Sequence, residues 1–307
     1  MRIAKAVGAA AVVGAAVAGW SVRETRQFGV TSLTVPVLPT GLGTLRVLHL
    51  SDLHLTTGQG AKQRWLAGLW EETQPDVTVV TGDFLADFDA VPTVLETLGD
   101  LLRHPGVFVL GSNDYYAPRI VNPFGYLLRP SELKIQRPEM PWGDLVSGLR
   151  EAGWADLSNA ATTMRLGDEQ LEVAFRGVDD PHIDRDRYQS VAGPYPEQAQ
   201  LRIGVTHSPY LRTLDALVAD GTDLVLAGHT HGGQVCLPGG RAIVTNCDLD
   251  PARASGLSTH DVGQVRASPL ASGSWLHVSP GIGTAPSAPF RLFCPPRATL
   301  LELTAIN

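Results

Sequence analysis

Two histidines separated by one residue stand in the glycine-rich segment Gly228–Gln234, whose sequence is GHTHGGQ. The segment follows an apolar run over 223–227 that predicts a buried strand. In extended backbone, side chains two residues apart project to the same side, so His229 and His231 could bind one ion. The neighbouring glycines let the backbone turn and let a ligand approach. The pattern predicts a site for Zn, Mn, Fe or Co, and a polar turn with two chance histidines is the alternative.

Four other apolar runs of strand length are each followed by side chains that can bind a metal ion. The runs are 45–50, 77–80, 107–110 and 201–206. The side chains that follow them, in chain order, are Asp52, His54, Asp83, Asn113, Asp114 and His207. Because open α/β sheets bind ligands beyond the carboxyl ends of their strands, we expect these side chains to converge at one edge. Asp52 and His54 are again two apart, so extended backbone would direct both to one point.

Segments with helical periodicity separate these strands, as in a sheet with crossover helices. We expect helices over 62–72, 91–102, 145–152 and 210–219, and a further strand over 171–177. Apolar runs at 275–278 and 298–303 predict two strands of a second sheet.

The segment 115–144 interrupts this alternation and is rich in aromatic residues, arginine and proline. Connections of this length often act as lids or binding elements, so we expect a cap or lid, with a surface excursion as the alternative. Asp179, Asp180 and His182 follow the strand at 171–177 and could line the same cleft, although such a cluster is more often a simple turn.

The composition is that of a folded chain with one large domain or two small ones. The chain has 307 residues, of which 44% are hydrophobic and 18% charged. Its net charge of −7 makes it a poor candidate for binding nucleic acid, and we expect no such partner. Three cysteines are too few for a disulfide scaffold, although a Cys236–Cys247 bridge across a hairpin is compatible with the spacing.

The N-terminus carries Arg2 and Lys5, followed by an apolar stretch over 6–20. The stretch is shorter than the roughly 20 residues that a spanning helix needs, and no cleavage site follows it. We expect a signal anchor and association with a membrane, on a side that the flanking charges do not determine. A helix packed on the domain of a cytoplasmic protein is the alternative. The expected organisation is an anchor and linker over 1–30 and one domain over 31–307.

Taken together, the ordered motifs D-x-H, G-D, N, H and G-H-x-H resemble those of the calcineurin-like metallophosphoesterase superfamily. The GHTHGGQ block and the N-terminal segment are similar to its bacterial, membrane- or export-associated branch. The resemblance covers residues 45 to 234 and the ending over 281–296. It implies a four-layer αββα sandwich, in which two mixed β-sheets are flanked by helices.

The resemblance also implies a pair of divalent metal ions, of which Mn, Fe, Zn and Co are candidates. One ion would be bound by Asp52, His54 and His231, and the second by Asn113, His207 and His229, with Asp83 bridging both. The implied activity is hydrolysis of a phosphomonoester, phosphodiester or pyrophosphate bond by a metal-bound hydroxide. By analogy with membrane-associated relatives, the substrate would be a phosphoester small molecule, lipid-linked or a nucleotide sugar.

One motif departs from the family pattern, which has Gly-Asn-His-Asp/Glu where this chain has Gly111-Ser112-Asn113-Asp114. If Asn113 is a ligand, Asp114 takes the place of the usual histidine, and both residues are catalytic candidates. Asp114 could face the phosphate as a protonated acid, or it could turn away and hydrogen-bond a histidine ligand, which we favour. The missing histidine also motivates a second hypothesis, that of a non-catalytic, membrane-tethered module that holds phosphorylated ligands.

Overall fold

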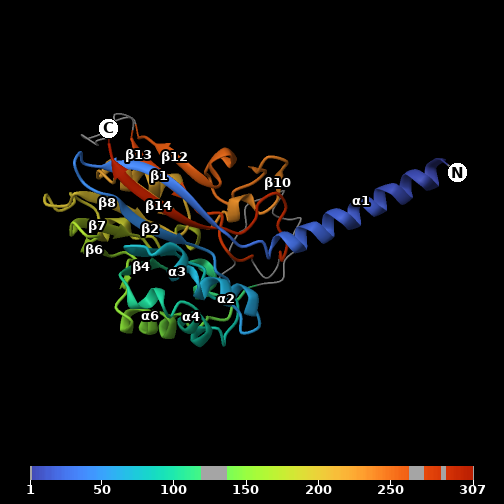
Figure 1. Cartoon of the computed structure of the whole chain (residues 1–307), viewed down its shortest axis with the longest axis horizontal. Coiled ribbons are helices and arrows are strands. Elements are labelled where there is room, and N and C mark those ends of the chain that lie inside the picture. Colours follow the sequence, from blue (N-terminus) through green and yellow to red (C-terminus); the bar gives the residue numbers. More distant parts are fainter. Residues whose placement is uncertain (1, 119–136, 263–272, 285–287, 307) are drawn as a thin grey trace.

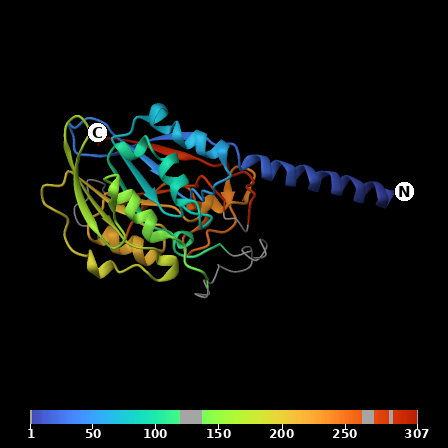
Figure 2. The same ribbon diagram turned by 90° about the horizontal axis from the view of Figure 1, so that it is seen from below.

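The structure is a computed structural model that describes residues 2–118, 137–262, 273–284 and 288–306. The larger part of the lid predicted at 115–144, namely residues 119–136, lies outside these ranges. The described residues form two six-stranded sheets that pack face to face, with helices on their outer faces (Figures 1 and 2).

The first sheet contains the expected strands at 45–50, 77–80 and 107–110. Its strand order is β1 (Val30–Leu38), β14 (Ala298–Ala305), β2 (Leu45–Leu50), β3 (Val77–Thr81), β4 (Gly106–Val109) and β5 (Ala155–Asp156). Strands β2 to β5 are parallel, and β14 runs antiparallel to β2.

The second sheet repeats this arrangement. Its strand order is β12 (Gly256–His260), β13 (Ser274–Val278), β9 (Leu224–Ala227), β8 (Leu201–Val205), β7 (Leu171–Gly177) and β6 (Ala161–Leu166). Strands β13, β9, β8 and β7 are parallel, whereas β12 and β6 run antiparallel at the two edges.

The prediction that both tail strands belong to the second sheet was wrong for β14. That strand pairs with β1 and β2 in the first sheet. Its Leu301 and Leu303 are fully buried in the core between the two sheets. An alternating apolar strand can cover either sheet, and its own sequence does not select one.

Three hydrophobic clusters define the four layers. One cluster lies between the first sheet and its helices α2 (Gly60–Ala67), α3 (Leu69–Thr73), α4 (Val91–Thr97) and α6 (Trp142–Glu151). The second fills the space between the sheets, and the third lies under α7 (Leu211–Ala219). The expected sandwich of two mixed sheets and flanking helices is confirmed.

Two expected helices are not continuous. The helix predicted over 62–72 is divided at Gly68 into α2 and α3. The helix predicted over 91–102 ends with α4 at Thr97 and is followed by a separate 3-10 turn at Leu101–Arg103. The remaining short elements are α5 (Ser112–Tyr115), β10 (Cys236–Leu237), β11 (Arg241–Ala242) and 3-10 turns at Pro181–Ile183, Tyr188–Ser190, His231–Gly233 and Pro251–Arg253.

Helix α1 (Arg2–Glu24) contains the apolar stretch 6–20 and extends away from the sandwich (Figure 1). Its C-terminal end contacts the body, where the carbonyl of Ser21 accepts a hydrogen bond from the N–H of Arg291 and Glu24 accepts one from the N–H of Cys294. Among the described residues, no helix is long and apolar enough to cross a membrane.

All three cysteines are free thiols, so the bridge between Cys236 and Cys247 is absent. Cys236 packs instead in a small buried cluster with Cys294, a residue that is distant in the sequence.

Candidate metal centre

Four of the predicted ligands form one buried cluster at the carboxyl ends of the strands. Ligand atoms of Asp52, His54, Asp83 and His231 all lie within 4.8 Å of one another. The Nε2 atom of His231 lies 3.4 Å from Oδ1 of Asp52, and that of His54 lies 3.5 Å from Oδ2 of Asp83. The side chains follow β2, β3 and β9, which belong to two different sheets, so the cluster forms only when the sheets pack together.

The carboxylate of Asp83 connects this cluster to the other predicted ligands. Nε2 of His207 lies 3.6 Å from Oδ2 of Asp83. Asn113 donates hydrogen bonds to both oxygens of Asp83, from its backbone N–H at 2.9 Å and from Nδ2 at 2.7 Å. The ring of His229 lies 5.2 Å from that of His207, and its Nε2 is 3.3 Å from the carbonyl oxygen of Asn246. Asp83 therefore occupies the central position expected of a bridging ligand.

The local backbone differs from the extended conformation that the sequence spacing suggested. Five of the seven candidates have a left-handed backbone, with φ angles of 53° at Asp52, 41° at His54, 56° at Asp83, 70° at His229 and 49° at His231. Such conformations cost non-glycine residues about 1–3 kcal/mol each and gather at functional sites. The shared direction of these side chains thus comes from turns after the strands and not from strand alternation.

Glycine is required at two points where the loops meet. A Cβ atom on Gly111 would lie 2.3 Å from Oδ1 of Asp83, and one on Gly228 would lie 1.8 Å from Oγ of Ser51. Any side chain at either position would push the loops of the two sheets apart.

The electrostatics of the cluster show a deficit of positive charge. Burial raises the pKa of Asp52, and burial together with repulsion from Asp52 raises the pKa of Asp83. Although burial opposes it, the carboxylates of Asp83, Asp180 and Asp52 raise the pKa of His207 to about 9. Burial lowers the pKa of His231 to about 3. Divalent cations would supply the missing charge.

Several polar atoms directed at the cluster are buried and have no hydrogen-bond partner. They are Oδ1 of Asp52, Nδ1 and Nε2 of His54, and Nε2 of His207. Nδ1 of His207 is 2.5 Å from the carbonyl oxygen of Thr81. When Nδ1 donates its proton to this carbonyl, the lone pair of the ring lies on Nε2, where it can bind a metal ion. Unsatisfied buried groups of this kind cost about 1–3 kcal/mol each, so their gathering around two carboxylates fits ligands for metal ions.

The carboxylate of Asp114 is held by backbone amides beside the cluster. Its Oδ2 accepts hydrogen bonds from the backbone N–H groups of Asp83 at 2.8 Å and Gly111 at 2.9 Å, and its Oδ1 accepts one from Leu85 at 3.0 Å. The partners are backbone amides and not the imidazole of a histidine ligand. This geometry favours reading the motif position for position, with Asn113 in the place of the usual histidine and Ser112 in that of the usual asparagine.

The cluster at 179–182 lies next to the centre. Oδ1 of Asp180 accepts a 2.7 Å hydrogen bond from Oγ of Ser208, and burial raises the pKa of Asp180 to about 6. The ring of His182 lies 4.5 Å from that of His229, and its Nδ1 is 3.0 Å from the hydroxyl of Tyr210. The sequence left two roles for this segment, lining the cleft or forming a simple turn. Its position beside the centre favours the first.

Lys62 is a buried cation to which the sequence pattern gave no role. Its ammonium donates hydrogen bonds to the backbone carbonyls of Leu53 at 2.5 Å and His54 at 2.9 Å. It therefore holds the turn that presents His54. The available signal was its spacing, because Lys62 and Leu66 are four residues apart on the buried face of α2.

Arg291 is a second such cation and is fully buried. Its Nη1 donates to the carbonyl of His231 at 3.3 Å, and its Nη2 donates to those of Gly281 at 3.1 Å and Gly283 at 2.6 Å. The guanidinium thus ties the histidine turn after β9 to the glycine-rich segment after β13. The sequence analysis included Arg291 only in the family-like ending over 281–296 and predicted no role for it.

Comparison with known proteins identifies relatives of the chain. A family model described as Calcineurin-like phosphoesterase matches residues 45–233, more than half of the chain. The "Transmembrane protein with metallophosphoesterase domain" of Bos taurus is 26% identical over 213 residues, which cover 67% of this chain and 45% of that protein. An "Uncharacterized metallophosphoesterase" of Aquifex aeolicus is 25% identical over 284 residues, covering 91% of this chain and 93% of that protein. The chain thus spans less than half the length of the bovine relative.

Among solved structures, the phosphopantetheinyl hydrolase of Mycobacterium tuberculosis is similar with a TM-score of 0.33 and 16% identity, covering 64% of this chain and 84% of that one. The anchor in the inner membrane complex of Plasmodium has a TM-score of 0.34 and 18% identity, covering 61% and 66% of the two chains. Likenesses of this size carry no functional argument.

Proposed function

Because the chain belongs to the calcineurin-like phosphoesterase family, we propose that it hydrolyses a phosphoester bond with the help of two divalent metal ions. The observation that carries the proposal is the set of unpartnered buried ligand atoms around Asp52 and Asp83. Hydrolysis of a monoester, a diester or a pyrophosphate would use the same centre, and the metals remain those that suit His and Asp ligands, namely Mn, Fe, Zn or Co.

In this proposal, Asp52, His54 and His231 hold one ion and His207 and His229 hold the other, with Asp83 between them and Asn113 beside Asp83 at the position of the usual histidine. The contacts of Asp83 with His54, His207 and Asn113 support this division. When bound, the ions supply Lewis acidity, which polarises the phosphoryl group and lowers the pKa of water towards about 7.

The residues of the chain would position the reacting groups. Two carboxylates against two dications leave a residual charge of about +2, which suits an anionic ester. In hydrolysis the oxygen of water bonds to phosphorus, the bond from phosphorus to the ester oxygen breaks, and that oxygen leaves with the alcohol. Because backbone amides engage the carboxylate of Asp114, the proposal gives this residue a positioning role. No side-chain acid at position 114 then protonates the leaving group.

The test is to measure metal content and hydrolysis on the same samples. We expect about two metal ions per chain by elemental analysis and turnover of para-nitrophenyl phosphate or its bis ester with Mn²⁺. Asp83→Asn should lower metal content and reduce turnover by at least about 100-fold, since even groups that only support ligands contribute 10–100-fold. Asp168→Asn, in the exposed turn before β7, is the matched control. Hydrolysis of no ester by the metal-loaded chain would overturn the proposal.

A non-catalytic, phosphate-holding module is the second candidate, favoured by Asn113 standing where the family has its histidine. It predicts tight binding of phosphate to the metal-loaded chain without turnover of any ester. The same elemental and kinetic measurements therefore separate the two candidates.

We also propose that residues 6–20 associate with a membrane. The proposal does not assign the domain to one side of it. The apolar composition of the stretch, the extension of α1 from the body and the names of two relatives support this proposal. The full chain should float with lipid vesicles, and a chain without residues 1–19 should not. Flotation of neither chain would favour the alternative of a cytoplasmic protein, and equal flotation of both would exclude residues 6–20 as the attachment.

A further inference from the structure

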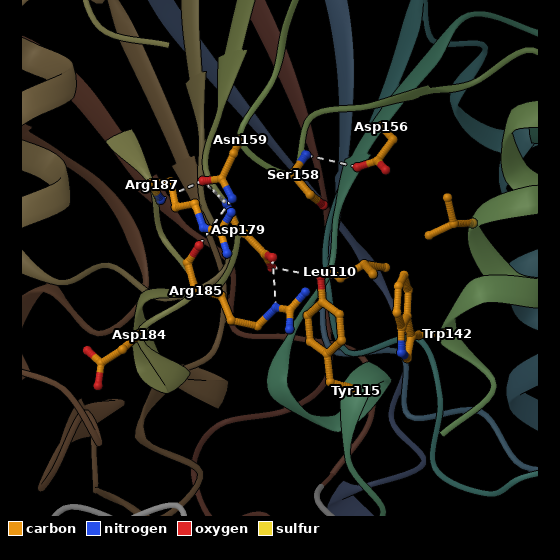
Figure 3. A pocket seen from close by; sticks show the side chains of 11 residues that line it. Leu110, Tyr115, Trp142, Asp156, Ser158, Asn159, Asp179, Asp184, Arg185 and Arg187 are labelled. Atoms are coloured by element: carbon orange, nitrogen blue, oxygen red, sulfur yellow. Dashed lines mark hydrogen bonds and ion pairs between the residues drawn. The ribbon is translucent and has the colours of Figure 1, made fainter. Parts of the chain in front are cut away.

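A cavity of about 300 Å³, drawn in Figure 3, is lined in part by residues close in sequence to those of the candidate metal centre. Its walls come from α5, from the start of α6, and from the segments that follow β5 and β7. The volume is at the lower end of the range for pockets that hold small molecules, about 300–1,000 Å³.

The cavity and the centre share two segments of the chain. Tyr115 lines the cavity and ends the short helix α5 that carries Asn113. Asp179 lines the cavity and precedes Asp180, which accepts a 2.7 Å hydrogen bond from Ser208, the residue after His207. A ligand with its phosphate at the centre would therefore extend into this cavity with its other end.

One wall of the cavity is aromatic. The rings of Tyr115 and Trp142 lie 5.5 Å apart and are inclined at 57° to each other. Figure 3 shows them side by side, with the guanidinium of Arg185 next to Tyr115, 3.9 Å from its ring centre. Trp142 is 36% exposed, so part of the indole is available to a ligand. Such walls favour planar groups.

One arginine that lines the cavity is not paired with a carboxylate among the described residues. Asp156 pairs with Arg150 at 2.9 Å, and Asp179 pairs with Arg185 at 2.8 Å. In the part of the chain that the structure describes, Arg187 forms no ion pair with a carboxylate, and its side chain is exposed. Arginine in this setting suits a planar or oxygen-rich anion, which it binds through two parallel hydrogen bonds.

The third carboxylate of the lining, Asp184, is exposed and shares its cation. It lies 3.2 Å from Nη2 of Arg212, which also pairs with Asp186 at 2.8 Å, and Figure 3 shows Asp184 apart from the aromatic wall. Among the described residues, no ion pair joins Asp184 to Arg187.

From these observations we infer that the cavity receives the leaving group of the substrate, and that this group carries a planar ring and a second negative charge, the chemistry of a nucleoside phosphate. Trp142 contacts the ring and Arg187 binds the charge. The inference rests on the proposed hydrolysis at the neighbouring centre. With a nucleoside diphosphate, the oxygen of water bonds to the terminal phosphorus, the bond to the bridging oxygen breaks, and that oxygen leaves with the nucleoside monophosphate.

The kinetic test compares adenosine diphosphate, para-nitrophenyl phosphate and glycerol phosphate on the metal-loaded full chain. We expect Arg187→Gln to lower kcat/KM for adenosine diphosphate about tenfold, the loss of one charged hydrogen bond, and to change the other two less than about twofold. Trp142→Leu should lower kcat/KM for the two ring-containing esters and leave glycerol phosphate unchanged. Arg165→Gln, at an exposed position on β6, is the matched control. Equal effects of Arg187→Gln on all three esters, or none, would overturn the inference.

A binding test separates this inference from the proposed hydrolysis. Adenosine monophosphate is titrated calorimetrically into Asp83→Asn, whose metal centre is weakened, with and without Arg187→Gln. The chain could hydrolyse no ester while the added Arg187→Gln still weakens this binding about tenfold. That result would support the assignment of the cavity and contradict the proposed hydrolysis. If esters are hydrolysed and adenosine monophosphate binds equally to both chains or to neither, the cavity assignment fails and the hydrolysis stands.

Discussion

The backbone N–H of Asp83 donates a 2.8 Å hydrogen bond to Oδ2 of Asp114. The backbone of Asp83, whose carboxylate lies at the middle of the candidate centre, is thus held by the carboxylate of Asp114. Because Asp114 also accepts from the N–H groups of Gly111 and Leu85, it fastens the turn after β3 to the turn after β4.

Asp114→Asn should therefore act on stability and metal binding and not on proton transfer. An amide can accept at only one oxygen, and its NH₂ would face a backbone donor, so at least one buried N–H loses its partner. We expect a loss of about 1–3 kcal/mol in the free energy of unfolding, measured in urea, together with lower metal content. Asp168→Asn should change neither quantity. An unchanged unfolding free energy with a lost basic limb in the pH–rate profile would instead indicate an acid.

Restoring the family motif should increase turnover of esters with poor leaving groups. The double variant Ser112→Asn with Asn113→His places the usual asparagine and histidine at the start of α5, next to Asp83. General acid catalysis contributes about 10²–10⁴-fold, so we expect a gain near its lower limit with an alkyl phosphate. Para-nitrophenyl phosphate, whose leaving group needs no proton, should change little. A gain of equal size with both esters would show that the histidine does not act as an acid.

Arg291→Met should destabilise the chain strongly. The substitution keeps much of the side-chain volume but leaves the carbonyls of His231, Gly281 and Gly283 without their donor. We expect a loss of about 3–5 kcal/mol in the free energy of unfolding, as for other broken buried polar networks. Arg241→Met, at an exposed position in β11, should stay within about 0.5 kcal/mol of the parent chain. Comparable losses in the two variants would contradict the role of Arg291 in holding these three carbonyls.

Burial raises the pKa of the Cys247 thiol to about 11. Because thiolate is the reactive form, alkylation of native Cys247 by iodoacetamide should increase about tenfold per pH unit until about pH 11. The unfolded thiol loses its proton first, near pH 8.5, so this group favours unfolding as pH rises between about 8.5 and 11. Labelling followed by mass spectrometry of the Cys247 peptide checks the profile. A plateau by about pH 9 would show a solvated thiol.

The sequence alone determined which positions could form the centre and where in the fold they would lie. Apolar runs of strand length end directly before Asp52, Asp83, His207 and His229. Parallel strands bring their carboxyl ends to one edge, so polar residues after several such strands must lie near one another. The strand pattern is local information, because each apolar run is defined by its own few residues and the turn signals beside it.

Only the tertiary structure decided how these residues are held. The left-handed backbone at His229 and His231 and the orientation of Asp114 depend on hydrogen bonds from distant segments, such as the carbonyls bound by Arg291. The sheet of β14 was predicted wrongly for the same reason, because an apolar strand can pair with either sheet. Periodicity records which side chains are apolar. It does not record which distant backbone group will satisfy a turn, because that choice is made when the two sheets pack.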